Sequence, residues 1–311
     1  MKIFFNGVRG SYPIAYPDNI EFGGNTTNIS ILGKNKELLM IDGGTGIRTV
    51  GRILMQGKCR QGQGKGHILI THTHWDHILG LLSFTPFFVE GNVFHIYAAR
   101  TECVSLKKIF EGLYDKDFFP VAFKDLPAKI VLHEINPGQS FTIDDFTIMT
   151  MQLNHPNTTL GYRISDGESI FTFITDTARI HVVPLGEGFL SIDDPHYNEF
   201  VESYEKRITD LAHKADLLVY DTHFREESIK GREHWGHSTP KDGIRIAEMA
   251  EARQLILFHH DPDEKDNDTR EKERIAKDIA KDKNFDVYAA YEGLCVELPS
   301  LKHNKEELNC K

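Results

Sequence analysis

A dense group of potential metal ligands directly follows the apolar run 66–70. It consists of His72, His74, Asp76 and His77, all within six residues. Alternate side chains of an extended segment share a face, so His72 and His74 point the same way. The turn after them can fold Asp76 and His77 onto a neighbouring point, which suits two adjacent cations. Imidazoles with carboxylates favour divalent metals such as zinc or manganese, whereas the competing interpretation is a chance cluster in a chain with sixteen histidines.

The same residue types recur along the chain, each just after an apolar, strand-like run or at its turn. The further candidates are Asp42, His155, Asp176, Asp221, His237 and His259. Loops gathered on one edge of a sheet are where α/β proteins build their sites, so we expect these residues to converge. Asp42 has two open interpretations. It either holds the histidine loop through hydrogen bonds or caps a helix predicted over 45–54.

Eleven apolar runs and six helical patterns must position these residues, and the segment 294–298 closes the fold. The strands are predicted over 2–5, 29–32, 37–41, 66–70, 92–97, 146–153, 161–164, 169–174, 216–220, 255–258 and 287–290, and the helices over 45–54, 78–82, 101–113, 197–212, 241–252 and 268–281. Residues 129–132 and 141–144 bracket Pro137-Gly138, which predicts a hairpin. The aromatic stretch 115–121 predicts either a lid over a planar ligand or apolar packing beneath a loop.

Composition and charge bound the class of protein. The chain has 311 residues, 40% of them hydrophobic and 26% charged, as in an ordinary soluble globular protein. The net charge of −10 argues against a broad face for binding polyanions. No apolar run approaches the roughly 20 residues that span a bilayer, so we expect no membrane contact. The cysteines form no CxxC pair and no signal peptide is evident, which predicts a cytoplasmic protein; they are Cys59, Cys103, Cys295 and Cys310.

The order of the candidate ligands, Asp, His-x-His-x-Asp-His, His, Asp and His, resembles the metallo-β-lactamase superfamily over almost the whole chain. The resemblance implies an αββα sandwich of two mixed β-sheets flanked by helices. It predicts one hydrolase domain over 1–301, with an insertion at about 178–213 and a polar tail at 302–311.

The resemblance also implies a site for two divalent metal ions, Zn²⁺ or Mn²⁺. The first would be held by His72, His74 and His155, the second by Asp76, His77 and His259, with Asp176 bridging the two. His259 is preferred to His260 because it directly follows the strand. A hydroxide between the two cations would be the nucleophile.

Two segments, 216–223 and 235–239, resemble the additional motifs of the ribonuclease Z-like branch. In that branch, an acid at Asp221 would orient His237, which would protonate the departing ribose oxygen. A positioned general acid of this kind contributes about 10²–10⁴ in rate. The alternative is that His237 only precedes a helix capped by Ser238 or Thr239.

The choice of substrate rests on finer features. Transfer-RNA processing enzymes of this branch carry a long arm, in many members inserted between the third histidine and the bridging aspartate. Here only residues 156–175 separate His155 from Asp176. Further stretches resemble a bacterial and phage subgroup linked to cyclic-nucleotide phosphodiesterases of the anti-Pycsar type: 7–11, 22–26, 71–77, 118–120 and 258–262.

The sequence therefore predicts a binuclear phosphodiesterase acting on a small cyclic nucleotide. We expect it to be a homodimer that forms no stable complex with nucleic acid. The alternatives are a ribonuclease Z-like nuclease acting on RNA or DNA ends, and a nucleotide-binding protein that does not hydrolyse its ligand. Arg9, Asn25 and Thr26 are predicted either to touch the phosphate or base, or only to build turns.

Overall fold

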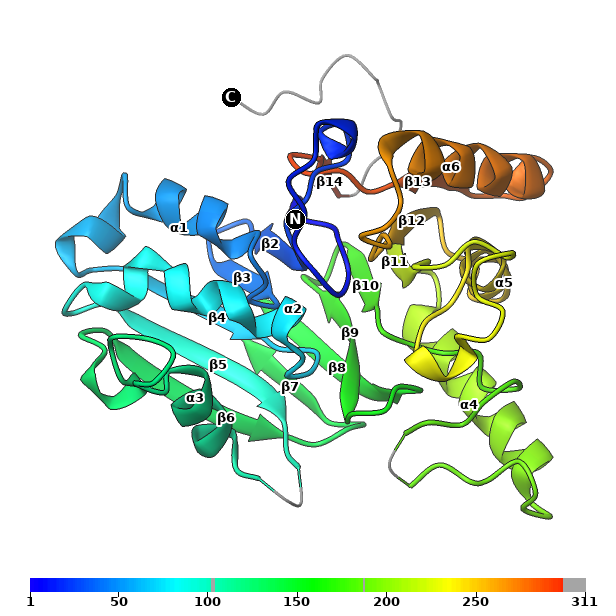
Figure 1. Ribbon diagram of the computed structural model, residues 1–311, viewed down its shortest axis with the longest axis horizontal. Helices are drawn as coiled ribbons and strands as arrows, with labels where there is room; N and C mark the ends of the chain where they lie inside the picture. The colour runs from blue at the N-terminus through cyan, green and yellow to red at the C-terminus, as the bar shows by residue number, and fades with distance from the viewer. Residues whose placement is uncertain (102–103, 187, 299–311) are drawn as a thin grey trace.

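Two seven-stranded β-sheets pack face to face in the computed structural model, which describes residues 1–101, 104–186 and 188–298 (Figure 1). The first sheet has the order β14 (Cys295–Glu297), β1 (Lys2–Gly7), β2 (Asn28–Leu32), β3 (Leu38–Ile41), β4 (Lys65–Leu69), β5 (Val93–Ala99) and β6 (Lys129–Ile135). The second has the order β13 (Asp286–Ala289), β12 (Gln254–Phe258), β11 (Leu217–Asp221), β10 (Ile170–Ile174), β9 (Thr159–Ser165), β8 (Phe146–Leu153) and β7 (Ser140–Ile143).

Each sheet is antiparallel at one end and parallel at the other. Strands β3 to β6 run parallel in the first sheet, and β10 to β13 do so in the second. The apolar side chains on the facing surfaces form one continuous core that includes residues of both sheets. Phe258 lies at its centre, with ring centroids 6.1 Å from Phe5 and 5.4 Å from Phe173. Burying each such ring stabilises the fold by about 1.5–3 kcal/mol, so the core holds the two sheets, and the ends of their strands, in register.

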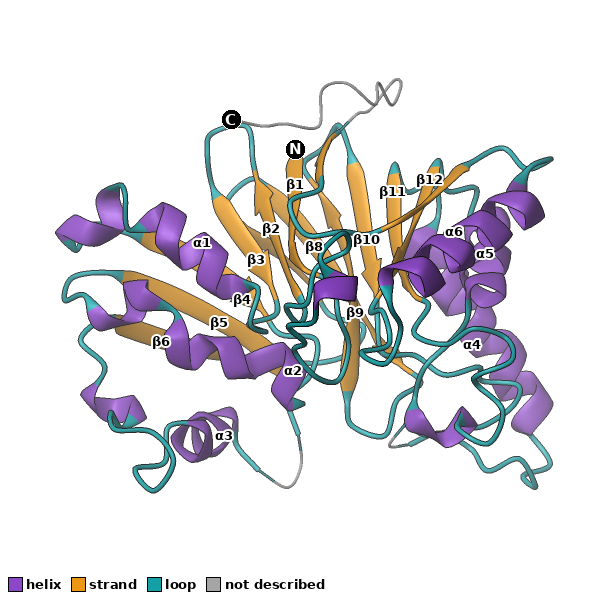
Figure 2. Cartoon of the chain, turned by 45° about the horizontal axis from the view of Figure 1, so that its top comes forward, coloured by secondary structure: helices purple, strands orange, loops and turns teal. Residues whose placement is uncertain are grey.

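Helices cover the outer faces of both sheets (Figure 2). The first sheet carries α1 (Ile47–Leu54), α2 (Trp75–Ile78) and α3 (Leu106–Leu113), and the second carries α4 (Tyr197–Ala212), α5 (Pro240–Met249) and α6 (Asp266–Ala280). Short 3₁₀ turns lie at Pro17–Asn19, Lys58–Gln61, Leu79–Ser83, Thr85–Phe88, Phe123–Asp125 and Glu233–Trp235. The predicted αββα sandwich of two mixed sheets is confirmed.

The hairpin predicted around Pro137-Gly138 is wrong. Strand β6 lies parallel to β5 in the first sheet, whereas β7 lies antiparallel to β8 in the second. The connection therefore carries the chain from one sheet to the other, and Gly138, with a φ of 79°, makes the turn. Two alternating runs around a Pro-Gly turn are compatible with either arrangement. Only the choice of partner strand decides between them, and that choice depends on the packing of the whole sandwich.

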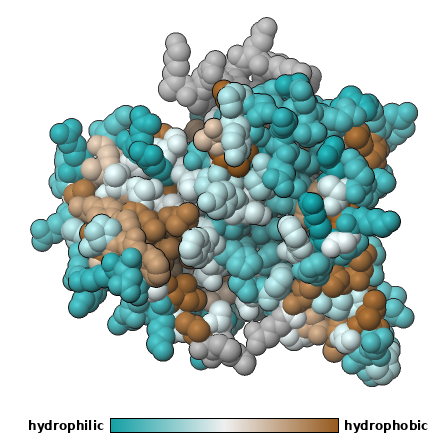
Figure 3. Space-filling view, viewed as in Figure 1, coloured by the Kyte–Doolittle hydropathy of each residue, from teal (hydrophilic) through white to brown (hydrophobic). Residues whose placement is uncertain are grey.

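The segment 115–121 packs, through Phe119, against aromatic residues that flank the first sheet. The Phe119 ring lies 5.5 Å from that of Tyr114 and 6.4 Å from that of Phe88, while Phe118 is 88% exposed. Figure 3 shows hydrophobic residues gathered on this face, in front of β5 between α2 and α3. The apolar-packing interpretation therefore holds for Phe119. The lid interpretation stays a prediction, and the residues of this segment are not among those that line the pocket described below.

The predicted insertion at 178–213 contains α4 and the loop before it. The Asn154 amide, at the end of β8, donates hydrogen bonds to the carbonyls of Ala178 and Val183, and its oxygen accepts one from the Leu185 amide. The loop is thereby tied to the strand end that carries His155. The predicted tail at 302–311, together with Cys103 and Cys310, lies outside the described residues. Within them, the buried Cys59 is a free thiol, and no helix is long and apolar enough to cross a membrane.

Candidate metal centre

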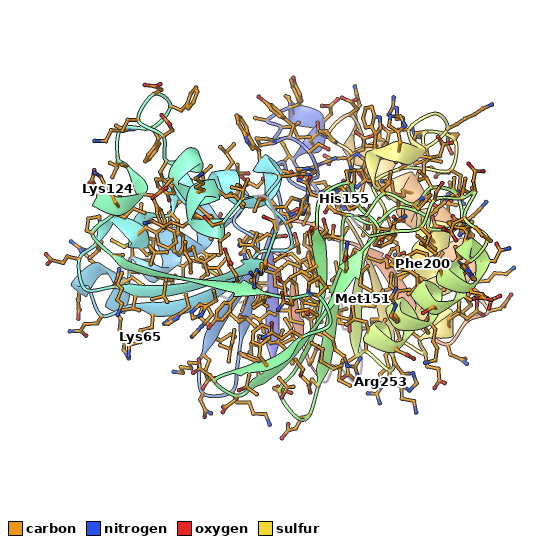
Figure 4. All side chains as sticks on the ribbon, turned by 90° about the horizontal axis from the view of Figure 1, so that it is seen from below. Lys65, Lys124, Met151, His155, Phe200 and Arg253 are labelled. Carbon is orange, nitrogen blue, oxygen red and sulfur yellow. The ribbon has the colours of Figure 1, made fainter. Side chains whose placement is uncertain are left out.

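The ends of four strands bring the predicted ligands together. The histidine stretch follows β4, His155 follows β8, Asp176 follows β10 and His259 follows β12. Figure 4 shows His155 at the end of its strand, close to the middle of the molecule. Asp176 and His259 adopt φ values of 58° and 63°, as does Asp42 at 59°. Such left-handed conformations are uncommon for non-glycine residues and gather at functional sites, where the surrounding structure enforces them.

The first group consists of three imidazoles. The Nδ1 atom of His74 lies 2.8 Å from Nε2 of His72 and 3.3 Å from Nε2 of His155. Nδ1 of His155 donates a hydrogen bond to the Gly236 carbonyl at 3.0 Å, so its Nε2 carries a lone pair toward the other two rings. Burial lowers the pKa of all three histidines, that of His155 to about 4, and therefore keeps them in the neutral form that binds metals.

The second group consists of two carboxylates and two imidazoles. Nε2 of His77 lies 3.2 Å from Asp76 and 3.3 Å from Asp176, and Nε2 of His259 lies 3.2 Å and 3.4 Å from the same two carboxylates. Asp176 also lies 3.8 Å from Nε2 of His72, which places it between the two groups. Within each group, the ligand atoms lie within 4.8 Å of one another.

The donor atoms of the second group are suited to a cation. Nδ1 of His77 donates to Asp42 at 2.7 Å, so its Nε2 presents a lone pair, buried and without a hydrogen-bond partner, to Asp76 and Asp176. A lone pair facing two carboxylates is repelled unless positive charge lies between them. Burial would lower the pKa of His77, but the carboxylates of Asp76, Asp176 and Asp42 together raise it well above its usual value. The buried carboxylates thus require positive charge, which a divalent cation in place of the His77 proton would supply.

Asp42 orients the second group through the Nδ1 atom of His77, which points away from Asp76 and Asp176. Its carboxylate accepts hydrogen bonds from the Thr71 amide at 2.7 Å and from Nδ1 of His77 at 2.7 Å. Helix α1 begins after Gly46 without a side-chain cap, so the capping interpretation of Asp42 is wrong and the orienting interpretation holds. Hydrogen bonds of this kind fix the tautomer and the ring orientation of a metal-ligating histidine.

His237 and Asp221 form a dyad beside the two groups. Nδ1 of His237 donates to Asp221 at 2.9 Å. Burial opposes the charged ring, but the Asp221 carboxylate prevails and raises the pKa of His237 to about 9. Two residues further on, Thr239 caps α5 in a capping box with Asp242. The helix cap and the carboxylate partner of His237 are therefore both present.

A pocket of about 300 Å³ opens onto the centre. Its lining residues are Ser11, His74, Asp76, His155, Pro156, Asp176, His234, Trp235 and His237. Two members of each ligand group, and His237 of the dyad, thus face one space. Ser11 was not singled out from the sequence; its backbone amide donates to Asp76 at 2.7 Å. The sequence could not indicate this contact, because any residue type except proline can donate from its backbone amide.

Other sequence candidates lie elsewhere. The Arg9 side chain is buried and donates to the carbonyls of Gly23, Asp261 and Glu264. Asn25 binds Glu292 with both its backbone amide and its side-chain amide, and Thr26 is buried against Thr45. The turn-building interpretation of all three residues holds, and the substrate-contact interpretation is wrong. Nε2 of His260 donates to the Ala290 carbonyl, so His259 and not His260 joins the cluster.

His223 is a buried member of the site that sequence reasoning did not single out. Its ring stacks on that of His237 at 4.4 Å, and its Nδ1 donates to the carbonyl of His259 at 2.9 Å. The nitrogens of His223, His237 and His259 also lie within 4.8 Å of one another. This third group has no carboxylate, and Nδ1 is engaged by an oxygen in both His223 and His237.

Comparisons with known proteins agree with this architecture. The family model described as the beta-lactamase superfamily domain matches residues 39–193. Ribonuclease Z of Haloferax volcanii is 23% identical over 292 residues, covering 83% of this chain and 84% of that protein. The metallo-beta-lactamase fold protein YhfI of Bacillus subtilis superposes with a TM-score of 0.63 at 20% identity, covering 95% and 98% of the two chains. The short form of human tRNase Z superposes with a TM-score of 0.61 at 19% identity, covering 96% and 100%.

Proposed function

We propose that this chain, a metal-dependent phosphoric diester hydrolase of the metallo-β-lactamase superfamily, cleaves the bond between phosphorus and a ribose oxygen in the manner of ribonuclease Z. The observation that carries the proposal is the His237–Asp221 dyad, in which Nδ1 of His237 lies 2.9 Å from the carboxylate and the His237 ring lines the same pocket as members of both ligand groups. An alkoxide leaves poorly without a proton, so a site with a positioned acid is suited to a ribose leaving group.

The proposed ligand assignment follows the two groups. His72, His74 and His155 would hold one divalent cation, and Asp76, His77 and His259 a second, with Asp176 between them. The imidazole and carboxylate donors suit Zn²⁺ or Mn²⁺. When bound, such cations lower the pKa of water and neutralise charge on the phosphate oxygens.

The residues of the chain supply the remaining steps. Asp221 accepts the Nδ1 proton of His237 and so directs Nε2 of that ring away from Asp221. Because the pKa of His237 is raised to about 9, the ring is protonated at neutral pH and can donate from Nε2 to the leaving oxygen. Asp42 keeps His77 in the tautomer that presents Nε2 to the second group. The Gly236 carbonyl does the same for His155 in the first.

RNA is the substrate that the comparisons favour. The ribonuclease Z of Haloferax volcanii aligns over 83% of this chain, and this relationship supports the nuclease alternative better than the cyclic-nucleotide prediction. A 3′-extended transfer-RNA precursor is therefore the first substrate to test. Zinc or manganese as the native metal, and the homodimer, stay predictions that belong to this proposal.

A small cyclic nucleotide is the second candidate, and one feature of the chain favours it. The residues between His155 and Asp176 form little more than the antiparallel pair β9 and β10, so no arm for gripping RNA extends from this place. The net charge of −10 also disfavours a partner whose affinity depends on neutralising phosphates. The substrate would then be held by the pocket itself.

One side-by-side assay tests both candidates. The metal-loaded protein is given a radiolabelled transfer-RNA precursor and, separately, a 3′,5′-cyclic nucleotide, with Asp176→Ala as the control. We expect cleavage of the precursor at a phosphodiester bond that leaves a free ribose hydroxyl. Turnover of the cyclic nucleotide alone would replace the first candidate by the second. Binding of either compound without turnover, in both zinc and manganese, would contradict the proposed hydrolysis.

A further inference from the structure

We propose that Trp235 is the stacking platform for the base of the leaving nucleoside, an inference that rests on the proposed hydrolysis of a nucleotide phosphodiester. Trp235 lines the pocket together with His155 and His237, and its side chain is 51% exposed. Among the described residues, it is the only tryptophan, tyrosine or phenylalanine in the lining of this pocket. Stacking on an indole suits every base, because each base has a π-face.

The backbone on either side fixes the position of Trp235. Gly236 has a φ of 92°, and a Cβ atom at this residue would lie 2.2 Å from Nδ1 of His155. The Gly236 carbonyl accepts a hydrogen bond from that same nitrogen. The next residue, His237, is held by Asp221. The turn that carries Trp235 is therefore locked between a proposed metal ligand and the proposed general acid.

The side chain of Trp235 is supported from its own loop. The guanidinium of Arg232 lies 5.4 Å from the centre of the indole ring and 5.7 Å from the ring of Phe224. Phe224 and Trp235 lie 6.2 Å apart, centroid to centroid. Arg232 also approaches Asp261 at 4.0 Å. These contacts restrict the movement of the indole, while half of its surface stays accessible. Because the side chain is already ordered, it loses less conformational entropy when a ligand stacks on it.

The position of the general acid indicates which nucleoside of the substrate would stack its base on Trp235. His237 donates its proton to the leaving ribose oxygen, so the leaving nucleoside lies on the His237 side of the pocket. Trp235 lies on that side, two residues before His237. The base and the leaving oxygen belong to the same ribose, so a nucleoside in contact with His237 presents its base to its immediate surroundings. The geometry thus assigns Trp235 to the leaving nucleoside, whether the substrate is an RNA or a cyclic nucleotide.

Tryptophan fluorescence tests the contact directly, because the chain has only two tryptophans. In Trp75→Phe, the indole of Trp235 is the only one left. The metal-loaded variant is titrated with adenosine 5′-monophosphate and with ribose 5-phosphate, which has the same sugar phosphate and no base. We expect quenching by the nucleotide and none by the sugar phosphate, and no response from Trp75 in Trp235→Phe. Equal responses to the two compounds, or an unchanged signal when calorimetry shows that the nucleotide binds, would overturn the proposal.

Kinetics separates this proposal from the proposed function. Trp235→Ala should lose about 5- to 150-fold in kcat/KM on the nucleotide substrate, the range that loss of a base-stacking contact gives. It should lose less than about 2-fold on the abasic analogue of that substrate, which keeps the ribose leaving group and has no aromatic ring to stack on the indole. Trp235→Phe should recover most of the loss, and Phe118→Ala, an exposed aromatic outside the pocket, should change neither substrate.

The two possible failures are distinguishable. An absence of hydrolysis of every phosphodiester, by the wild-type protein, would contradict the proposed function. Hydrolysis of both substrates with the same loss for Trp235→Ala on each would contradict only the stacking role. That result would leave Trp235 as a residue that supports the fold of its loop through Arg232 and Phe224.

Discussion

Replacing His237 by alanine should separate the chemistry of proton donation from metal binding. The imidazole of His237 donates a hydrogen bond to Asp221 at 2.9 Å, and its pKa, raised to about 9, keeps it protonated at neutral pH. A general acid of this kind accounts for about 10²–10⁴ in rate, so His237→Ala should lose that factor in kcat on a substrate with a ribose leaving group. The loss should fall below about 10-fold on methyl 4-nitrophenyl phosphate, because 4-nitrophenolate leaves without a proton.

The metal content of the same variant provides the second readout. His237 belongs to neither of the two proposed ligand groups, so His237→Ala should keep as much metal as the wild-type protein. Steady-state kinetics on the two substrates and elemental analysis of one preparation measure both effects. An equal loss on the two substrates would refute the role as acid. Loss of a metal ion from His237→Ala would instead indicate that the third group, with His223 and His259, holds a cation.

Four further predictions follow from the site and the core. Asp221→Asn removes the carboxylate that raises the pKa of His237, so the alkaline fall in kcat/KM, near pH 9 in the wild-type protein, should move to lower pH; an unchanged pH–rate profile would contradict the dyad. Asp176→Ala removes the carboxylate between the two groups and should lose bound metal, as elemental analysis would show; full retention would exclude the bridging role. Asp42→Ala frees the His77 ring and should weaken metal affinity about 10–100-fold in a chelator competition, whereas wild-type affinity would mean that Asp42 has no orienting role. Phe173→Ala, in the core between the sheets, should cost about 3–5 kcal/mol in the free energy of unfolding by denaturant titration, and a cost below about 1 kcal/mol would mean that the core is not continuous there.

Much of the site was readable from the sequence because its ligands sit at strand ends. The run 255–258 is apolar on both faces, and the residue that follows it is the first one free to carry chemistry. This is why His259 could be preferred to His260, and the structure places His260 against the Ala290 carbonyl. A polar helix was also predicted around residues 197–212, and the structure has a helix at Tyr197–Ala212.

The errors came from features that residue types do not encode. The stretches around Pro137-Gly138 looked like the two arms of a hairpin, but their partners are β5 and β8, in different sheets. Strand pairing of this kind depends on contacts distant in sequence. Arg9 was a plausible phosphate contact by charge alone, yet its side chain is buried and donates from Nε and Nη1 to three carbonyls of the surrounding loops. His223 became visible only when the packing placed its ring against His237.

An anomalous-difference map from a crystal of the protein grown with Zn²⁺ tests the central claim, that strand ends from both sheets converge to hold two cations. We predict two peaks in each chain, one in contact with His72, His74 and His155 and the other with Asp76, His77 and His259, and Asp176 in contact with both. A single peak, or a peak held by His223 and His237 in place of either, would contradict the account.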